Sequence, residues 1–115
     1  MNQTELPITW NDFTKIEMRV GKVITAEIFK EAQKPAFKMA IDFGKFGIRK
    51  TSAQITQKYE TEEVIGKQVI AVINFPPKQI ANIMSECLIL GVVGENNEVT
   101  LLSVDKEVEN GLRIG

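Results

Sequence analysis

The residues that could do chemistry are concentrated in one short segment, NFPPKQIANIMSECLIL, residues 74–90. Two prolines end an apolar strand and fix the backbone that follows, because proline locks one backbone dihedral. The segment then offers a basic group for a phosphate, and amide or hydroxyl groups for a base edge or a ribose: Asn74, Lys78, Gln79, Asn82 and Ser85. A rigid segment loses little entropy on binding, so the pattern favours a recognition loop. Asn82 also tolerates a left-handed backbone, and its alternative interpretation is a turn.

Catalytic and metal chemistry find little support in the rest of the sequence. There is no histidine and only one cysteine, Cys87, which excludes a structural zinc site, a Cys-His pair and a Ser-His-Asp triad. Acidic pairs such as Glu62 and Glu63 are typical of solvated turns. The turn GKFG, 44–47, lacks both the Lys-Ser/Thr ending and the following helix of a phosphate-binding loop. We therefore expect no catalysis, no metal and no cofactor, and we interpret Cys87 as a small buried hydrophobe.

The composition is that of a soluble globular domain. The chain has 115 residues, of which 43% are hydrophobic and 25% charged, and this length predicts one domain. No apolar run approaches the roughly 20 residues that span a bilayer, and the N-terminus does not resemble a secretory signal, so we expect a cytoplasmic protein. The net charge is -1, so any nucleic-acid binding would have to depend on a local basic patch.

The first elements that position the segment are an N-terminal arm, 1–16, and a long strand, 18–29. Thr9 is a candidate cap for a short helix, WNDFTKI, in which Trp10 and Phe13 face one side. Gly21 inside the strand indicates a bulge or a sharp bend. The even positions of the strand predict one apolar face, broken by Lys22: Met18, Val20, Ile24, Ala26 and Ile28.

The remaining elements complete the fold prediction. The stretch 37–43 alternates apolar and polar residues, and the turn 44–47 should return the chain as a hairpin strand, 48–53. A short helix with Thr61 as its candidate cap precedes a buried central strand, and two more strands and an extended C-terminal stub follow. This order is typical of an all-β protein, a five-stranded OB-fold Greek-key barrel with a helix between strands three and four. A split βαβ fold would need a second long helix. We divide the chain into the arm, 1–16, and a barrel with a C-terminal extension, 17–115.

A binding face can be placed on this predicted barrel. OB barrels bind extended chains or single-stranded nucleic acid across their second and third strands and the flanking loops. Here those strands and the first loop would form a positive strip with Lys78: Lys30, Lys34, Lys38, Arg49, Lys50 and Ser52. The alternative is that charged outward positions on the strands only make the surface soluble.

Several blocks of sequence resemble the CsaA family of stand-alone tRNA-binding-domain proteins, also described as export-related chaperones. These blocks are EAQKPAFKMAIDFG, SAQIT, QVIAVINFPPKQI and SECLILG, and the resemblance extends from about Phe13 to Gly115. More distantly, the chain is similar to the tRNA-binding OB domain at methionyl-tRNA synthetase C-termini. The pattern of that wider group around the two prolines is matched at Asn74, Pro77, Lys78, Ile80 and Ser85. Ala81 replaces an arginine of the pattern, which would remove a phosphate contact, and Asn82 replaces a glycine.

The resemblance implies a non-catalytic homodimer that binds tRNA by shape. The residues expected to hold tRNA are Lys38, Arg49, Lys50, Ser52, Gln54, Asn74, Lys78, Asn82 and Ser85. The alternative implied by the family is a chaperone for unfolded or presecretory polypeptides, which would bind in apolar grooves at the dimer junction. Candidates for the dimer contact or the peptide groove are Trp10, Phe13, Phe75 and Pro76, and the alternative for Trp10 and Phe13 is packing onto their own barrel. The two activities are not exclusive.

Overall fold

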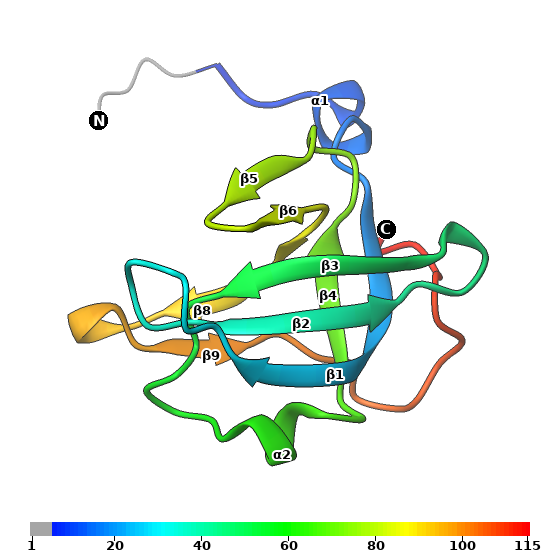
Figure 1. Cartoon of the computed structure of the whole chain (residues 1–115). Coiled ribbons are helices and arrows are strands. Elements are labelled where there is room, and N and C mark those ends of the chain that lie inside the picture. Colours follow the sequence, from blue (N-terminus) through cyan, green and yellow to red (C-terminus); the bar gives the residue numbers. More distant parts are fainter. Residues whose placement is uncertain (1–5) are drawn as a thin grey trace.

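The computed structural model describes residues 6–115, and strands dominate the chain (Figure 1). Five antiparallel strands form one sheet in the order β3-β2-β1-β4-β7, which curls into a nearly closed barrel. Their bounds are β1 Met18–Ile28, β2 Phe37–Asp42, β3 Ile48–Ala53, β4 Gln68–Val72 and β7 Leu88–Ile89. Two hairpins complete the strands, one from β5 Lys78–Ile80 and β6 Ile83–Ser85, the other from β8 Gly91–Val93 and β9 Val99–Leu101. The predicted all-β OB barrel is confirmed.

The helical segments are short. They are α1 Trp10–Thr14, η1 Gly44–Phe46, α2 Thr61–Val64 and η2 Glu95–Asn97. The predicted cap of α1 is confirmed, because the Thr9 hydroxyl accepts a hydrogen bond from the Asp12 backbone N–H at 3.1 Å. Among the described residues, no helix is long and apolar enough to cross a bilayer. Residues 1–5 of the predicted arm lie outside the described residues.

The helix α2 lies between β3 and β4 as predicted, but the prediction of its cap was wrong. Glu60 is the N-cap, and Thr61 is the first helical residue. The Glu60 backbone N–H donates to the Glu63 carboxylate at 2.9 Å, so the two glutamates cap one another. The Thr61 hydroxyl instead donates to the Glu62 carboxylate at 2.8 Å.

The barrel core follows from the alternation of β2 and the continuous apolar run of β4. Phe37, Met39 and Ile41 of β2 are buried, whereas the residues between them are only partly covered. All five residues of β4 are buried, as expected for a central strand. The turn 44–47 returns the chain so that β3 pairs with β2 along its whole length, and the predicted hairpin is confirmed.

The apolar face predicted for β1 is confirmed at Val20 and Ala26 but is wrong at Ile24 and Ile28. Val23 is buried, whereas Ile24 and Ile28 are 38% and 66% exposed. The register with β2 shifts between Val23 and Thr25, so the irregularity falls at Ile24 rather than at Gly21. The extra residue at Ile24 exchanges the inward positions of the strand. Before it Val23 pairs with buried Ile41, and beyond it Ala26 pairs with buried Met39 and packs on the core.

Gly21 serves close packing instead of a bulge. A Cβ atom at this position would lie 2.6 Å from Ile41 Cγ2 and 2.6 Å from Phe43 Cε1. Both of those side chains are fully buried. The absent side chain therefore lets the β2 core residues sit directly against the β1 backbone.

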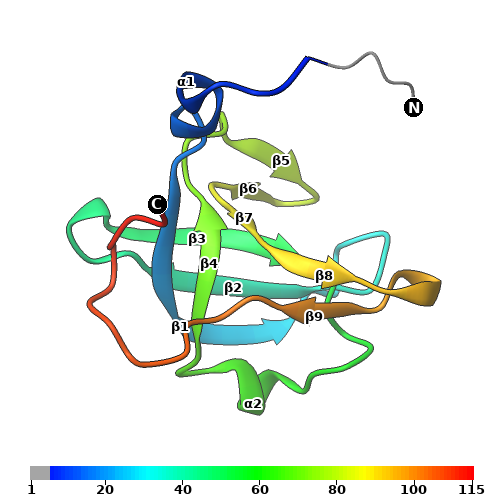
Figure 2. The same cartoon turned by 180° about the vertical axis from the view of Figure 1, so that it is seen from behind.

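The C-terminal segment lies along β1, as Figure 2 shows from behind. The Gly111 N–H donates to the Val20 carbonyl at 2.7 Å, and the Ile114 N–H donates to the Met18 carbonyl at 2.9 Å. The predicted extended stub is thus an added edge to β1. Buried Gln68 fixes the preceding loop, because its side-chain amide donates to the Val108 carbonyl at 2.6 Å.

Candidate nucleic-acid interface

The outer surface of β2 and β3 brings several of the predicted RNA-contacting residues together. Lys38 pairs with Ser52 across the two strands, and Ala40 pairs with Lys50. Side chains of directly paired residues share a face of the sheet, and the residues between them, such as buried Thr51, point into the barrel. Lys38, Lys50 and Ser52 therefore lie on one outward surface, and β3 leads directly into exposed Gln54.

A polar hollow of about 490 Å³, here called the polar pocket, adjoins this surface. One wall comes from the loop 31–36, another from the hairpin β5–β6, and the end of β3 lies between them. Its polar lining includes Glu31, Lys34, Ser52, Gln54, Lys78 and Gln79. Three of the predicted site residues, Ser52, Gln54 and Lys78, thus line the same hollow.

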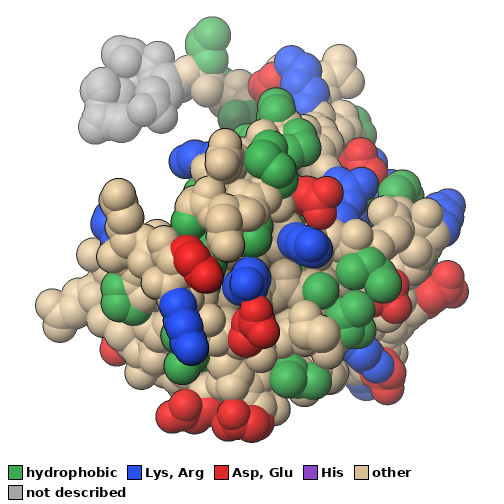
Figure 3. All heavy atoms as spheres, viewed as in Figure 1, with side chains coloured by type: hydrophobic (Ala, Val, Ile, Leu, Met, Phe, Trp, Pro, Cys, Tyr) green, Lys and Arg blue, Asp and Glu red, His purple; other side chains and the backbone are tan. Residues whose placement is uncertain are grey.

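The basic groups of this face are interspersed with carboxylates. Figure 3 shows Lys and Arg side chains among Asp and Glu side chains on the face that carries β2 and β3. Lys38 is paired with Glu27 at 3.0 Å and lies over the Phe29 ring. Lys34 and Lys78 form no ion pair within residues 6–115. Two lysines at the polar pocket are therefore available to meet a phosphate.

Arg49 is not part of the outward surface. It alternates with Lys50 and shares the inward side of β3 with Thr51. Its guanidinium donates to the Ile73 carbonyl at 2.7 Å and to the Glu86 carbonyl at 3.5 Å. These bonds join β3 to the segments on both sides of the β5–β6 hairpin, so Arg49 fixes the position of the hairpin.

Asn74 is also committed to backbone groups. Its side-chain oxygen accepts from the Glu17 N–H at 3.0 Å, and its side-chain nitrogen donates to the Lys15 carbonyl at 2.7 Å. Both ends of the amide are therefore used to attach the chain after α1 to the end of β4. Sequence alone could not indicate this contact, because the partners are 57 and 59 residues away.

Ser85 and Asn82 lie at opposite ends of β6. The Ser85 hydroxyl lies 3.2 Å from the Thr51 hydroxyl and joins the hairpin to β3. Asn82 is exposed in the hairpin turn. The alternative interpretation of Asn82 as a turn residue is confirmed, but the left-handed backbone of this turn belongs to Ala81, whose φ is 49°. The Gln79 side chain supports this turn by donating to the Ala81 carbonyl at 3.2 Å.

The apolar candidates lie on the arm and just after β4. Trp10 and Phe13 of α1 face each other, with ring centroids 5.5 Å apart, and Trp10 is 70% exposed. Phe75 is 56% exposed, and Pro76 is exposed beside it. Trp10, Phe75 and Pro76 are therefore exposed for a further contact, whereas Phe13 is half-buried.

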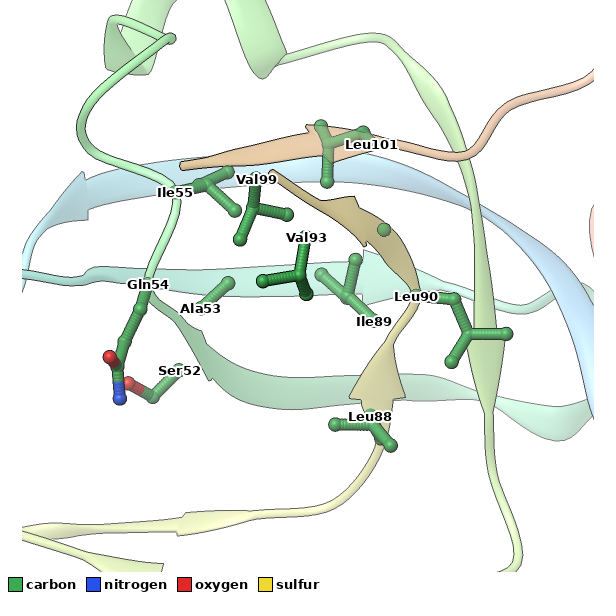
Figure 4. Close-up of a pocket in the computed structure, with 11 residues that line it drawn as sticks. Ser52, Ala53, Gln54, Ile55, Leu88, Ile89, Leu90, Val93, Val99 and Leu101 are labelled. Carbon is green, nitrogen blue, oxygen red and sulfur yellow. The ribbon is translucent and has the colours of Figure 1, made fainter. Parts of the chain in front are cut away.

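A second hollow, here called the apolar pocket, was not predicted from the sequence. It measures about 330 Å³ and lies between the end of β3 and the strands β7, β8 and β9. Figure 4 shows its lining, which includes Ile55, Ile89, Val93, Val99 and Leu101. The uninterrupted run LILGVV, 88–93, was the available signal, because it is more apolar than two short strands at a surface require.

The thiol of Cys87 is not exposed on the surface. Cys87 is buried, as predicted, and its carbonyl accepts a hydrogen bond from the Thr51 hydroxyl at 2.9 Å. Burial raises the pKa of the Cys87 thiol from 9.0 to about 11, although the Thr51 hydrogen bond and the nearby Arg49 charge act in the opposite direction. Among the described residues, no three His, Cys, Asp or Glu side chains form a group that could hold a metal ion.

This raised pKa gives a pH-dependent stability. The unfolded chain releases the Cys87 proton at lower pH than the folded chain, so the free energy of unfolding should fall between about pH 9 and pH 11. Two pKa units correspond to roughly 2–3 kcal/mol. Urea unfolding of wild type and of Cys87→Ala across this range checks the prediction, because the two proteins differ only in the Cys87 thiol. Two curves of equal slope would contradict it.

The barrel and the position of the polar pocket define an OB-fold binding domain. Residues 18–113 match the family described as "Putative tRNA binding domain". The CsaA chaperone protein of Picrophilus torridus is 50% identical, with a TM-score of 0.88 over 95% of this chain and 100% of that chain. The CsaA chaperone of Bacillus anthracis is 45% identical, with a TM-score of 0.90 over 96% of this chain and 100% of that chain. The chain belongs to the tRNA-binding-domain family and, within it, to the CsaA family.

The relation to methionyl-tRNA synthetases is also confirmed. The methionine–tRNA ligase of Methanocella arvoryzae is 40% identical over 108 residues, which are 94% of this chain. The chain spans 15% of the length of that ligase. The likeness therefore covers one domain of a much longer enzyme.

Proposed function

We propose that the chain is a non-catalytic, cytoplasmic tRNA-binding protein that holds structured RNA against the outer surface of β2 and β3 and the β5–β6 hairpin. The observation that carries this proposal is the convergence of Lys34, Lys78, Ser52 and Gln54 on one polar pocket in a member of a tRNA-binding family. Lys38, Lys50 and Asn82 extend the contact surface. Arg49, Asn74 and Ser85 support it by holding the hairpin and the arm in place.

We further propose that two copies act together. One polar pocket and one short row of lysines offer few phosphate contacts, whereas a twofold pair doubles them and raises their effective concentration. The aromatic side chains of the arm, exposed Trp10 and half-buried Phe13, are suited to this contact because each can bury a large apolar area.

Filter binding of tRNA across a series of salt concentrations tests the RNA proposal. Phosphate contacts release counterions, so the logarithm of the association constant should fall steeply and linearly with the logarithm of salt concentration. Light scattering on the same samples gives the mass of the free protein and of the complex. Absence of tRNA binding at low salt would refute the function, and a monomer mass in both states would refute only the dimer.

The alternative is a chaperone that binds unfolded or presecretory polypeptide, and the apolar pocket favours it. Ser52 and Gln54 border this pocket at the end of β3. On this edge of β3 the Lys50 N–H donates to the Glu86 carboxylate at 2.9 Å and the Lys50 carbonyl accepts from the Glu86 N–H at 2.8 Å, so a peptide would pair beyond Lys50, at Ser52. An extended peptide could pair there and insert an apolar side chain into the pocket. Binding of an unfolded, labelled polypeptide that persists at high salt would support the alternative, because apolar burial is not screened.

A further inference from the structure

The polar pocket has the dimensions of a site for one small group. Its volume of about 490 Å³ lies within the range of about 300–1,000 Å³ typical of small-ligand sites. An RNA double helix presents only its shallow minor groove and its phosphates to a protein, and its paired bases cannot enter such a hollow. A single unpaired nucleotide that leaves the helix can enter it.

The charges of the pocket walls would orient such a nucleotide. Lys34 on the loop and Lys78 on β5 both line the hollow, and neither forms an ion pair within the described residues. Both ammonium groups are therefore available to phosphates. Glu31 lines the same hollow and repels phosphate. The phosphates should lie on the lysines, and the base should turn toward the side of Glu31.

The Gln54 amide is placed to meet the edge of that base. Figure 4 shows the Ser52 and Gln54 side chains directed away from Val93 and Val99, which belong to the apolar pocket. Gln54 is exposed, and no hydrogen bond within residues 6–115 occupies its amide. A glutamine amide donates and accepts at once, and its matched partner is the N6/N7 edge of adenine. The Glu31 carboxylate can also accept from an exocyclic amino group.

The pocket differs from the usual stacking site for single-stranded RNA. Among the described residues, no aromatic side chain lines it, so a base cannot be held between rings. Ile80, Ala36 and Ala81 offer a modest apolar contact to the base plane. Discrimination would therefore depend on hydrogen bonds at the base edge, and it should be lost when the amide is removed.

We propose that the polar pocket receives one unpaired adenosine of the bound RNA, with its phosphates on Lys34 and Lys78 and its base edge on Gln54. The proposal rests on the RNA-binding function proposed above and goes beyond recognition of helix shape, because it assigns sequence preference to a single position.

Three RNA probes test it: a blunt duplex, the same duplex with a two-nucleotide adenosine overhang, and the same duplex with a uridine overhang. Wild type should bind the adenosine overhang about tenfold more tightly than either other probe. Gln54→Leu should bind the three probes with equal affinity, because the preference for adenosine depends on the Gln54 amide. Gln57→Leu is the matched control, since Gln57 lies outside the polar pocket and donates to the Asn96 carbonyl. It should retain the preference.

The outcomes separate the two proposals. Equal binding of all three probes by wild type would overturn the adenosine site and leave RNA binding intact. A preference for adenosine that survives Gln54→Leu would overturn the assigned role of Gln54. Absence of binding to tRNA and to every probe would overturn the proposed function together with this inference.

Discussion

Reversing the charges of Lys34 and Lys78 together is expected to weaken tRNA binding about a hundredfold at moderate salt. The two lysines line opposite walls of the polar pocket and have no ion-pair partner among the described residues, so each is available to a phosphate. Each lost phosphate contact should also lower the slope of log affinity against log salt by about one. Filter binding of Lys34→Glu/Lys78→Glu across a salt series measures both quantities.

The matched control for this double variant is Lys67→Glu/Lys106→Glu. Both control lysines are exposed, neither lines the polar pocket, and the control has the same net charge as the test variant. General repulsion of RNA by a more acidic protein would weaken the two variants equally. Equal losses in test and control would thus remove the polar pocket from the RNA interface.

The largest effect on stability is expected at Gly21. Substitution by alanine would place Cβ 2.6 Å from Ile41 Cγ2 and 2.6 Å from Phe43 Cε1, which is closer than side-chain atoms can pack. Both neighbours are fully buried, and β1 is fixed by β2 on one side and β4 on the other. Neither the side chains nor the strand can move away easily. We expect Gly21→Ala to lower the free energy of unfolding by about 3 kcal/mol, measured by urea denaturation.

Gly47→Ala provides the comparison. Gly47 has a positive φ of 86°, but nothing lies within 4 Å of a Cβ atom built there. Its substitution should therefore cost only the backbone strain of this conformation, about 2 kcal/mol. If Gly21→Ala is no more destabilising than Gly47→Ala, close packing of β2 against β1 is not what requires glycine at position 21.

The parts of the fold that followed from the sequence are those in which side-chain alternation alone decides. The strand β2 alternates without interruption, and the turn after it fixes the register of β3, so the outward positions Lys38, Lys50 and Ser52 could be assigned in advance. The bulge at Ile24 could not, because isoleucine is an ordinary strand residue and the irregularity arises from pairing with β2.

The candidate site residues that could be predicted from the sequence are those whose side chains are exposed and not bonded to the rest of the protein. Arg49, Asn74 and Ser85 have the same chemical character as RNA-contacting residues, yet their polar groups bond to the protein itself. Apart from the Cys87 carbonyl, to which the Ser85 hydroxyl also donates, these partners lie 24 to 59 residues away in the chain, so no local pattern indicates them. The turn at Ala81 was missed because alanine rarely adopts a positive φ, and Asn82 was the better local candidate.

The end of β3 forms a boundary shared by the two hollows, since Ser52 and Gln54 line both of them. If RNA and polypeptide are both ligands, each would use the Ser52 and Gln54 side chains in a different conformation. Binding of one ligand would then lower the affinity of the protein for the other. Thermodynamic linkage makes such antagonism mutual and equal in size. A cell rich in unfolded chains would then release RNA from this protein, and the exchange would need no hinge, lid or change of fold.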